Sequence, residues 1–129
     1  MDAARLRSVP LFASLSDHDR QRIAMWTDEI DIPAGKRLAA EGELAYEFFV
    51  ILDGTAEVTH DGETLAELGP NDFFGEIGLL ETERRTATVT ATTLLTALVM
   101  FGPNFRHVER EMPELATKIR AAIGERISL

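Results

Sequence analysis

The stretch that most narrows the fold and function of this chain reads Phe74-Gly75-Glu76-Ile77-Gly78-Leu79-Leu80, then four further residues, then Arg85-Thr86-Ala87-Thr88-Val89. We call it the 74–89 window. A glycine before Glu76 lets the backbone turn tightly and approach a ligand with no Cβ in the way. If the residues that follow form one helical turn, its first amide groups are unpaired and can face an anion.

Two charged side chains of the window indicate the kind of ligand. Arg85 can form a bidentate, charge-assisted contact with phosphate oxygens, worth about 1.5–3 kcal/mol. Glu76 only accepts hydrogen bonds when ionised, so its natural partner is a sugar hydroxyl. The window therefore predicts a site for a nucleotide whose ribose and phosphate lie close together.

Around the window, residues 29–101 have the pattern of an all-β sandwich or barrel. Short apolar or alternating runs are separated by turn residues every eight to twelve positions. These turns are Pro33-Ala34-Gly35, Glu41-Gly42-Glu43, Asp53-Gly54, Asp61-Gly62 and Gly69-Pro70-Asn71-Asp72.

Helical patterns flank the strand region. Ser16-Asp17-His18-Asp19 resembles a capping box and, with the helical spacing of Ile23, Trp26 and Ile30, predicts a helix from about Asp17 to Trp26. Near the other end, Pro113 suits a first helical position. An i, i+4 apolar stripe follows it, made of Leu115, Ile119, Ile123 and Ile127.

Composition excludes several classes of function. The chain has 129 residues, a formal net charge of −9, a pI near 4.7 and no cysteine. An acidic surface repels nucleic acid and anionic membranes, and disulfides and thiolate chemistry are absent. We expect one cytoplasmic domain, because the N-terminus lacks a signal-peptide pattern and no segment approaches membrane-spanning length.

An enzyme is not expected. A metal-dependent cupin of this size needs clustered histidine and carboxylate ligands, and the chain has no His-x-His pair. His18, His60 and His107 are scattered among charged residues, which is typical of surface histidines. No residue has the pattern of an activated nucleophile, so neither a catalytic residue nor a metal is predicted.

The window and its surroundings resemble the cyclic nucleotide-binding domains of protein kinase A regulatory subunits, bacterial catabolite activators and cyclic-nucleotide-gated channels. Segments that carry the resemblance beyond the window are Val9-Pro10-Leu11-Phe12, Pro33-Ala34-Gly35, Glu41-Gly42-Glu43 and the run from Phe49 to Val58. It implies a mainly β fold with flanking helices, a double-stranded β-helix of the jelly-roll type. The single domain would comprise an N-terminal helical element (1–28), an eight-stranded β-roll (29–101) and C-terminal helices (102–129).

The resemblance also assigns roles to site residues. Glu76 would accept from the ribose 2′-hydroxyl, and Arg85 would pair with the cyclic phosphate, with the adjacent Arg84 as the alternative cation. Thr86 would lie near the purine, and Arg126 would stack on it, with Arg120 as the alternative. The residues assigned to the turn and to the backbone amides around the phosphate are Gly75, Ile77, Gly78, Leu79 and Ala87.

The function implied is a sensor that binds cAMP, with cGMP as the alternative ligand, and signals by moving its C-terminal helix. The partner would be an effector protein, or a second copy of the chain through that helix, with no nucleic acid and no membrane. Two alternatives stay open. One is a degenerate domain of the same fold that binds no nucleotide. The other is the N-terminal half of a catabolite-activator-type regulator, although the sequence given stops at Leu129 without a helix-turn-helix.

Overall fold

The computed structural model describes residues 2–43, 47–74, 85 and 87–126, and only the backbone at 119, 120 and 122–126. Three short helices come first: α1 (Ala3–Leu6), α2 (Pro10–Ala13) and α3 (Asp17–Ala24). The strands are β1 (Asp28–Ile32), β2 (Arg37–Ala39), β3 (Glu47–Asp53), β4 (Ala56–His60), β5 (Glu63–Leu68), β6 (Phe73–Phe74), β7 (Thr88–Ala91) and β8 (Leu95–Phe101). Two helices follow, α5 (Gly102–Glu111) and α6 (Pro113–Arg126).

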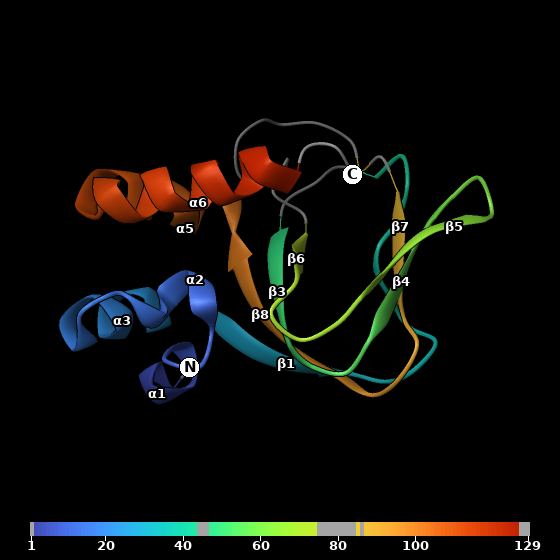
Figure 1. The fold of residues 1–129 in the computed structure, drawn as a ribbon, viewed down its shortest axis with the longest axis horizontal. Coiled ribbons are helices and arrows are strands. Elements are labelled where there is room, and N and C mark those ends of the chain that lie inside the picture. Colours follow the sequence, from blue (N-terminus) through green and yellow to red (C-terminus); the bar gives the residue numbers. More distant parts are fainter. Residues whose placement is uncertain (1, 44–46, 75–84, 86, 127–129) are drawn as a thin grey trace.

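The strands form two antiparallel sheets. One has the order β1-β8-β3-β6 and the other the order β2-β7-β4-β5. Figure 1 shows the two sheets as a roll on one side of the molecule and the helices gathered on the other. This arrangement confirms the prediction of a mainly β roll with flanking helices.

Strands β3 and β8 separate two hydrophobic clusters. On one face Phe48 and Met100 pack with residues of the helices, among them Phe12 and Phe105. On the other face Phe49 and Val99 pack inside the roll. Because successive side chains of a strand point to opposite faces, the continuous apolar runs of β3 and β8 are buried on both sides.

The β4–β5 hairpin turns at Asp61-Gly62, as the sequence predicts. Asp61 has φ 50° and Gly62 has φ 83°, the left-handed pair that a two-residue hairpin turn of type I′ requires. His60 and Glu63 are therefore paired across the hairpin. This turn presents His60 and Asp61 next to the loop that follows β2.

The predicted helix beginning at Asp17 is α3, and Ser16 is its N-cap. The Ser16 hydroxyl accepts a hydrogen bond from the Asp19 amide at 3.1 Å. The helix ends at Ala24, two residues before the predicted end. The correction has a local cause, since the Trp26 amide bonds to the carbonyl of Ile23 and tightens the last turn. Ile30 belongs to β1, not to a helical stripe.

A buried arginine on α3 holds the end of α2. Arg20 is 8% exposed, and its Nη1 donates to the carbonyls of Ala13 (3.1 Å), Phe12 (3.4 Å) and Leu15. Its Nη2 donates to the Asp17 carboxylate. The hydrogen bond from Arg20, together with Arg7, lowers the pKa of Asp17.

The C-terminal helices meet at a bend. Met112 has φ −139° and ψ 64°, and Pro113 begins α6, the first-turn position that the sequence predicts. Leu115 is buried against the helical cluster; the side chains at 119, 123 and 127 lie outside the described part. Within the described residues, no helix is long and apolar enough to span a bilayer.

Candidate functional site

The structure describes only part of the predicted site. Arg85 and Ala87 are described with their side chains, and both are half-buried. Arg126 closes α6, but its side chain, like that of Arg120, lies outside the described part. The predicted site residues that lie wholly outside it are Gly75, Glu76, Ile77, Gly78, Leu79, Arg84 and Thr86.

Arg85 is fixed by its backbone and by its side chain. Its amide donates to the Glu43 carbonyl at 2.7 Å, and its carbonyl accepts from the Gly42 amide at 3.0 Å. Its guanidinium donates through Nη2 to the carbonyl of Glu47, the first residue of β3, at 2.9 Å. A guanidinium carries five N–H donors in a planar fork whose geometry suits phosphate oxygens.

The first residue of the 74–89 window is anchored on the same strand as Arg85. Phe74 lies in β6, opposite Phe49 of β3, and the two rings stack with centroids 4.8 Å apart. Phe74 and Arg85 are therefore both attached to the first half of β3, at Phe49 and at Glu47. Ten residues separate Phe74 and Arg85 in the sequence, and strand β3 supports both.

Downstream of Arg85 the chain enters β7 next to the same loop. The hydroxyl of Thr88 accepts from the amide of Glu41 at 3.1 Å. Ala87 precedes this residue directly, so it lies where the loop after β2 meets β7. An open depression of about 230 Å³ adjoins the loop, and it is lined by Arg37, Leu38, Ala39, Ala40 and Glu43.

Sequence reasoning missed two contributions to this region. The first is the support of Arg85 by the carbonyls of Glu43 and Glu47; a backbone acceptor has no sequence signature, although the Glu41-Gly42-Glu43 turn marks the place. The second is a cluster made by Glu41, His60 and Asp61. The sequence predicts a surface histidine at 60 and no metal, but the fold brings two carboxylates to this imidazole.

Comparison with known proteins identifies the scaffold. The model of the "Cyclic nucleotide-binding domain" family matches residues 29–111, which enclose the whole 74–89 window. A cAMP-dependent protein kinase regulatory subunit of Eremothecium gossypii is 36% identical over 104 residues. A cyclic nucleotide-gated potassium channel of Rhizobium etli is 32% identical over 119 residues. These matches take in 80% and 92% of this chain but 23% and 33% of the relatives, so the chain spans a quarter to a third of their length.

Solved structures show the same fold. A putative cyclic nucleotide-binding protein from Geobacter metallireducens superposes with a TM-score of 0.84 at 23% identity, covering 97% of this chain and 94% of that one. The catabolite activator protein of Thermus thermophilus superposes with a TM-score of 0.81 at 27% identity, covering 92% of this chain and 58% of that one.

Proposed function

Because the chain belongs to the cyclic nucleotide-binding domain family, we propose that it is a regulatory module that binds cAMP in preference to cGMP and signals by moving α6. The observation that carries the proposal is the fixed position of Arg85 within the matched region. Its peptide is held by Gly42 and Glu43 and its guanidinium by Glu47. A cation held in place before the ligand arrives loses less conformational freedom on binding a phosphate.

In this proposal the residues of the 74–89 window and Arg126 contact different parts of the nucleotide. Arg85 binds the cyclic phosphate, with Arg84 as the neighbouring cation, and Glu76 accepts from the ribose 2′-hydroxyl. Thr86 lies near the purine, and Arg126 stacks on it at the end of α6. The turn and the amides around the phosphate come from Gly75, Ile77, Gly78, Leu79 and Ala87. In a chain of charge −9 these amides and Arg85 have to supply a local positive field.

The preference for cAMP is supported by the relatives. The relative from Eremothecium gossypii is by name the regulatory subunit of a cAMP-dependent protein kinase. The kinase regulatory subunit and the potassium channel both name a cyclic nucleotide, but a kinase and a channel differ in output. The proposal accordingly assigns the ligand and not the effector, and it includes no catalytic step.

The bend at Met112 supports a moving α6. The first turn of this helix is docked through the buried Leu115 and Ala116, while its last described residue is Arg126. A ligand that contacts the far end of α6 can shift the helix about the bend by as much as its affinities for the two positions differ.

Titration of the protein with cAMP and with cGMP tests the ligand and the movement together. We expect calorimetric heat and thermal stabilisation with both, and tighter binding of cAMP. The single tryptophan, Trp26, stacks on His107 of α5 with ring centroids 5.8 Å apart, so its fluorescence should change when the C-terminal helices shift. No heat and no thermal shift with either nucleotide at about 1 mM would rule out binding stronger than about −4 kcal/mol. Heat without any change in fluorescence would leave the ligand in place and would show that no movement of α6 is passed on to α5.

Replacement of Arg85 by alanine should weaken cAMP binding by at least about tenfold, or 1.4 kcal/mol. The reason is the loss of charge-assisted hydrogen bonds to the phosphate. Arg85→Lys should lose less, because it keeps the charge but not the fork. The control is Arg7→Ala, an exposed cation of the N-terminal helices that pairs with Asp17, and it should bind as the wild type does. Unchanged affinity in Arg85→Ala, with loss in Arg84→Ala, would transfer the phosphate role to Arg84.

A further inference from the structure

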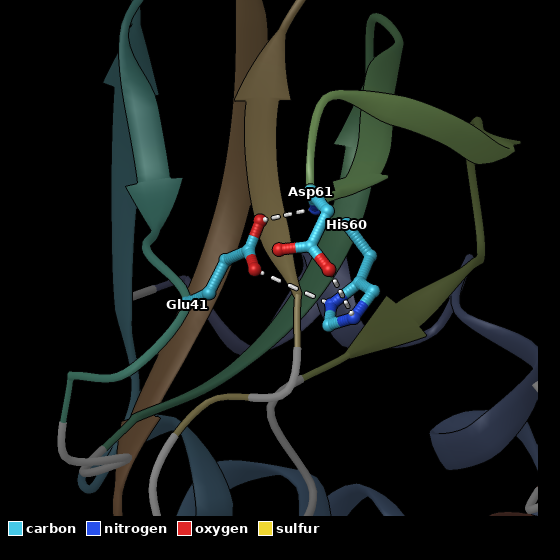
Figure 2. A group of neighbouring side chains, drawn as sticks. All are labelled: Glu41, His60 and Asp61. Atoms are coloured by element: carbon cyan, nitrogen blue, oxygen red, sulfur yellow. Dashed lines mark hydrogen bonds and ion pairs between the residues drawn. The ribbon is translucent and has the colours of Figure 1, made fainter.

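A second group of chemically active side chains lies beside the loop that supports Arg85. It comprises Glu41 in that loop, His60 at the end of β4 and Asp61 in the β4–β5 turn (Figure 2). One ligand atom from each residue can be chosen so that all three lie within 4.8 Å of one another. We call this group the Glu41–His60–Asp61 cluster.

The imidazole of His60 is oriented by a carboxylate at each ring nitrogen. Its Nδ1 lies 3.3 Å from Oε2 of Glu41, and its Nε2 lies 3.2 Å from Oδ2 of Asp61. Histidines that bind metals typically donate the N–H of the second ring nitrogen to a carboxylate, which fixes the tautomer and the ring. The two carboxylates therefore hold the imidazole in one orientation in the absence of an ion.

The backbone around the cluster is held in place by independent contacts. The Asp61 amide donates to Oε1 of Glu41 at 3.1 Å, and the Glu41 amide donates to the hydroxyl of Thr88 at 3.1 Å. Asp61 itself occupies the left-handed turn at φ 50°. Residues separated by twenty positions are thus joined, while the His60 and Asp61 side chains, 52% and 83% exposed, remain open to solvent.

The chemistry of these ligands selects the kind of ion. An imidazole nitrogen favours Zn²⁺ and its neighbours in the first transition row over Mg²⁺ and Ca²⁺, which prefer oxygen alone. Zinc bonds of about 2.0–2.2 Å place neighbouring ligand atoms of a tetrahedron about 3.3–3.6 Å apart. The 3.3 Å between Nδ1 of His60 and Oε2 of Glu41 matches this spacing. The Asp61 carboxylate lies beside the other ring nitrogen, but it is 83% exposed, so its side chain can rotate toward the nitrogen that binds the ion.

We propose that the Glu41–His60–Asp61 cluster is a binding site for a divalent transition-metal ion of the Zn²⁺ type. One oxygen from each carboxylate and one nitrogen of His60 are the protein ligands, and water completes the coordination. A dication there offsets two adjacent carboxylates in a chain that carries −9 overall. It joins the β4–β5 hairpin to the loop whose next residue, Gly42, donates to the carbonyl of Arg85.

Calorimetric titration of chelator-treated protein with ZnCl₂, without nucleotide, tests the site. We expect one ion bound per chain, and at least about tenfold weaker binding in Glu41→Gln, His60→Ala and Asp61→Asn. Glutamine keeps an acceptor for the Asp61 amide and asparagine tolerates a positive φ, so these two variants should melt as the wild type does without metal. The control is His18→Ala, an exposed histidine of α3, which should leave the affinity unchanged.

Titration with MgCl₂ under the same conditions should give no comparable binding. Zinc affinity that is the same in His60→Ala and in the wild type would overturn the proposal, as would the absence of zinc binding at about 1 mM. Because no nucleotide is present in this experiment, its failure would leave the proposed nucleotide site untouched, and the reverse also holds.

Discussion

Replacement of Gly54 by alanine is expected to lower the free energy of unfolding by about 3 kcal/mol or more. Gly54 joins β3 to β4 with φ +89°, and a Cβ there would lie 2.4 Å from the Leu94 carbonyl oxygen and 2.8 Å from the Leu95 Cα. Both neighbours are backbone atoms, so no side chain can rotate away. Leu95 is completely buried in the roll and holds that backbone in place.

Gly62→Ala is the matched control for this variant. Gly62 has φ +83°, nearly the same as Gly54, but a Cβ there meets nothing within 4 Å. Gly62→Ala should therefore lower the free energy of unfolding only by the backbone strain, about 1 kcal/mol. Urea unfolding followed by circular dichroism gives both values. Equal losses in the two variants would mean that the backbone at Leu94 and Leu95 shifts to accept the new Cβ. The close contact at Gly54 would then not contribute to the loss of stability.

Arg20→Ala should also destabilise the protein by about 3 kcal/mol, because three carbonyls at the end of α2 lose a charged donor in a largely buried place. A matched variant is Arg22→Ala on the same helix. Arg22 pairs with Glu111 at 2.7 Å, and these side chains are 29% and 56% exposed, so its loss should stay below about 1 kcal/mol.

The loss in Arg20→Ala should also depend on pH. The pKa of Asp17 is lowered chiefly by the hydrogen bond from Arg20, so its contribution to stability is present above the unfolded value of 3.8 and disappears as the pH falls through the folded value. The difference between wild type and Arg20→Ala, measured by urea unfolding, should accordingly be larger at pH 7 than at pH 3. If the difference in stability is the same at pH 7 and at pH 3, the contact with Asp17 does not contribute to the stabilisation by Arg20.

The parts of the fold that could be predicted from the sequence are those set by neighbouring residues. Ser16 caps the helix that begins at Asp17, and Asp61-Gly62 makes the tight hairpin, because each motif satisfies its own backbone locally. The resemblance carried by the 74–89 window added the roll itself. The end of α3 was placed two residues too far, since Trp26 has helical spacing but packs against His107.

What could not be predicted depends on partners chosen by the tertiary structure. Arg20 lies in a polar helical segment and has the pattern of a solvated charge, and nothing in the sequence marks the carbonyls that it binds. His60 meets Glu41 only because the β4–β5 hairpin returns to the loop after β2. The sequence predicts a phosphate-binding role for Arg85, but the support of its guanidinium by the Glu47 carbonyl is a backbone contact that residue types do not encode.

The two-faced strands β3 and β8 have a consequence for how such a protein can evolve. Phe48 and Met100 pack against the helices, whereas Phe49 and Val99, one position away in their strands, pack in the interior of the roll. Which substitutions are tolerated at alternate positions of these strands therefore depends on different neighbouring residues. Descendants can change the helical layer, and with it what they attach to, while inheriting the interior of the roll almost unaltered.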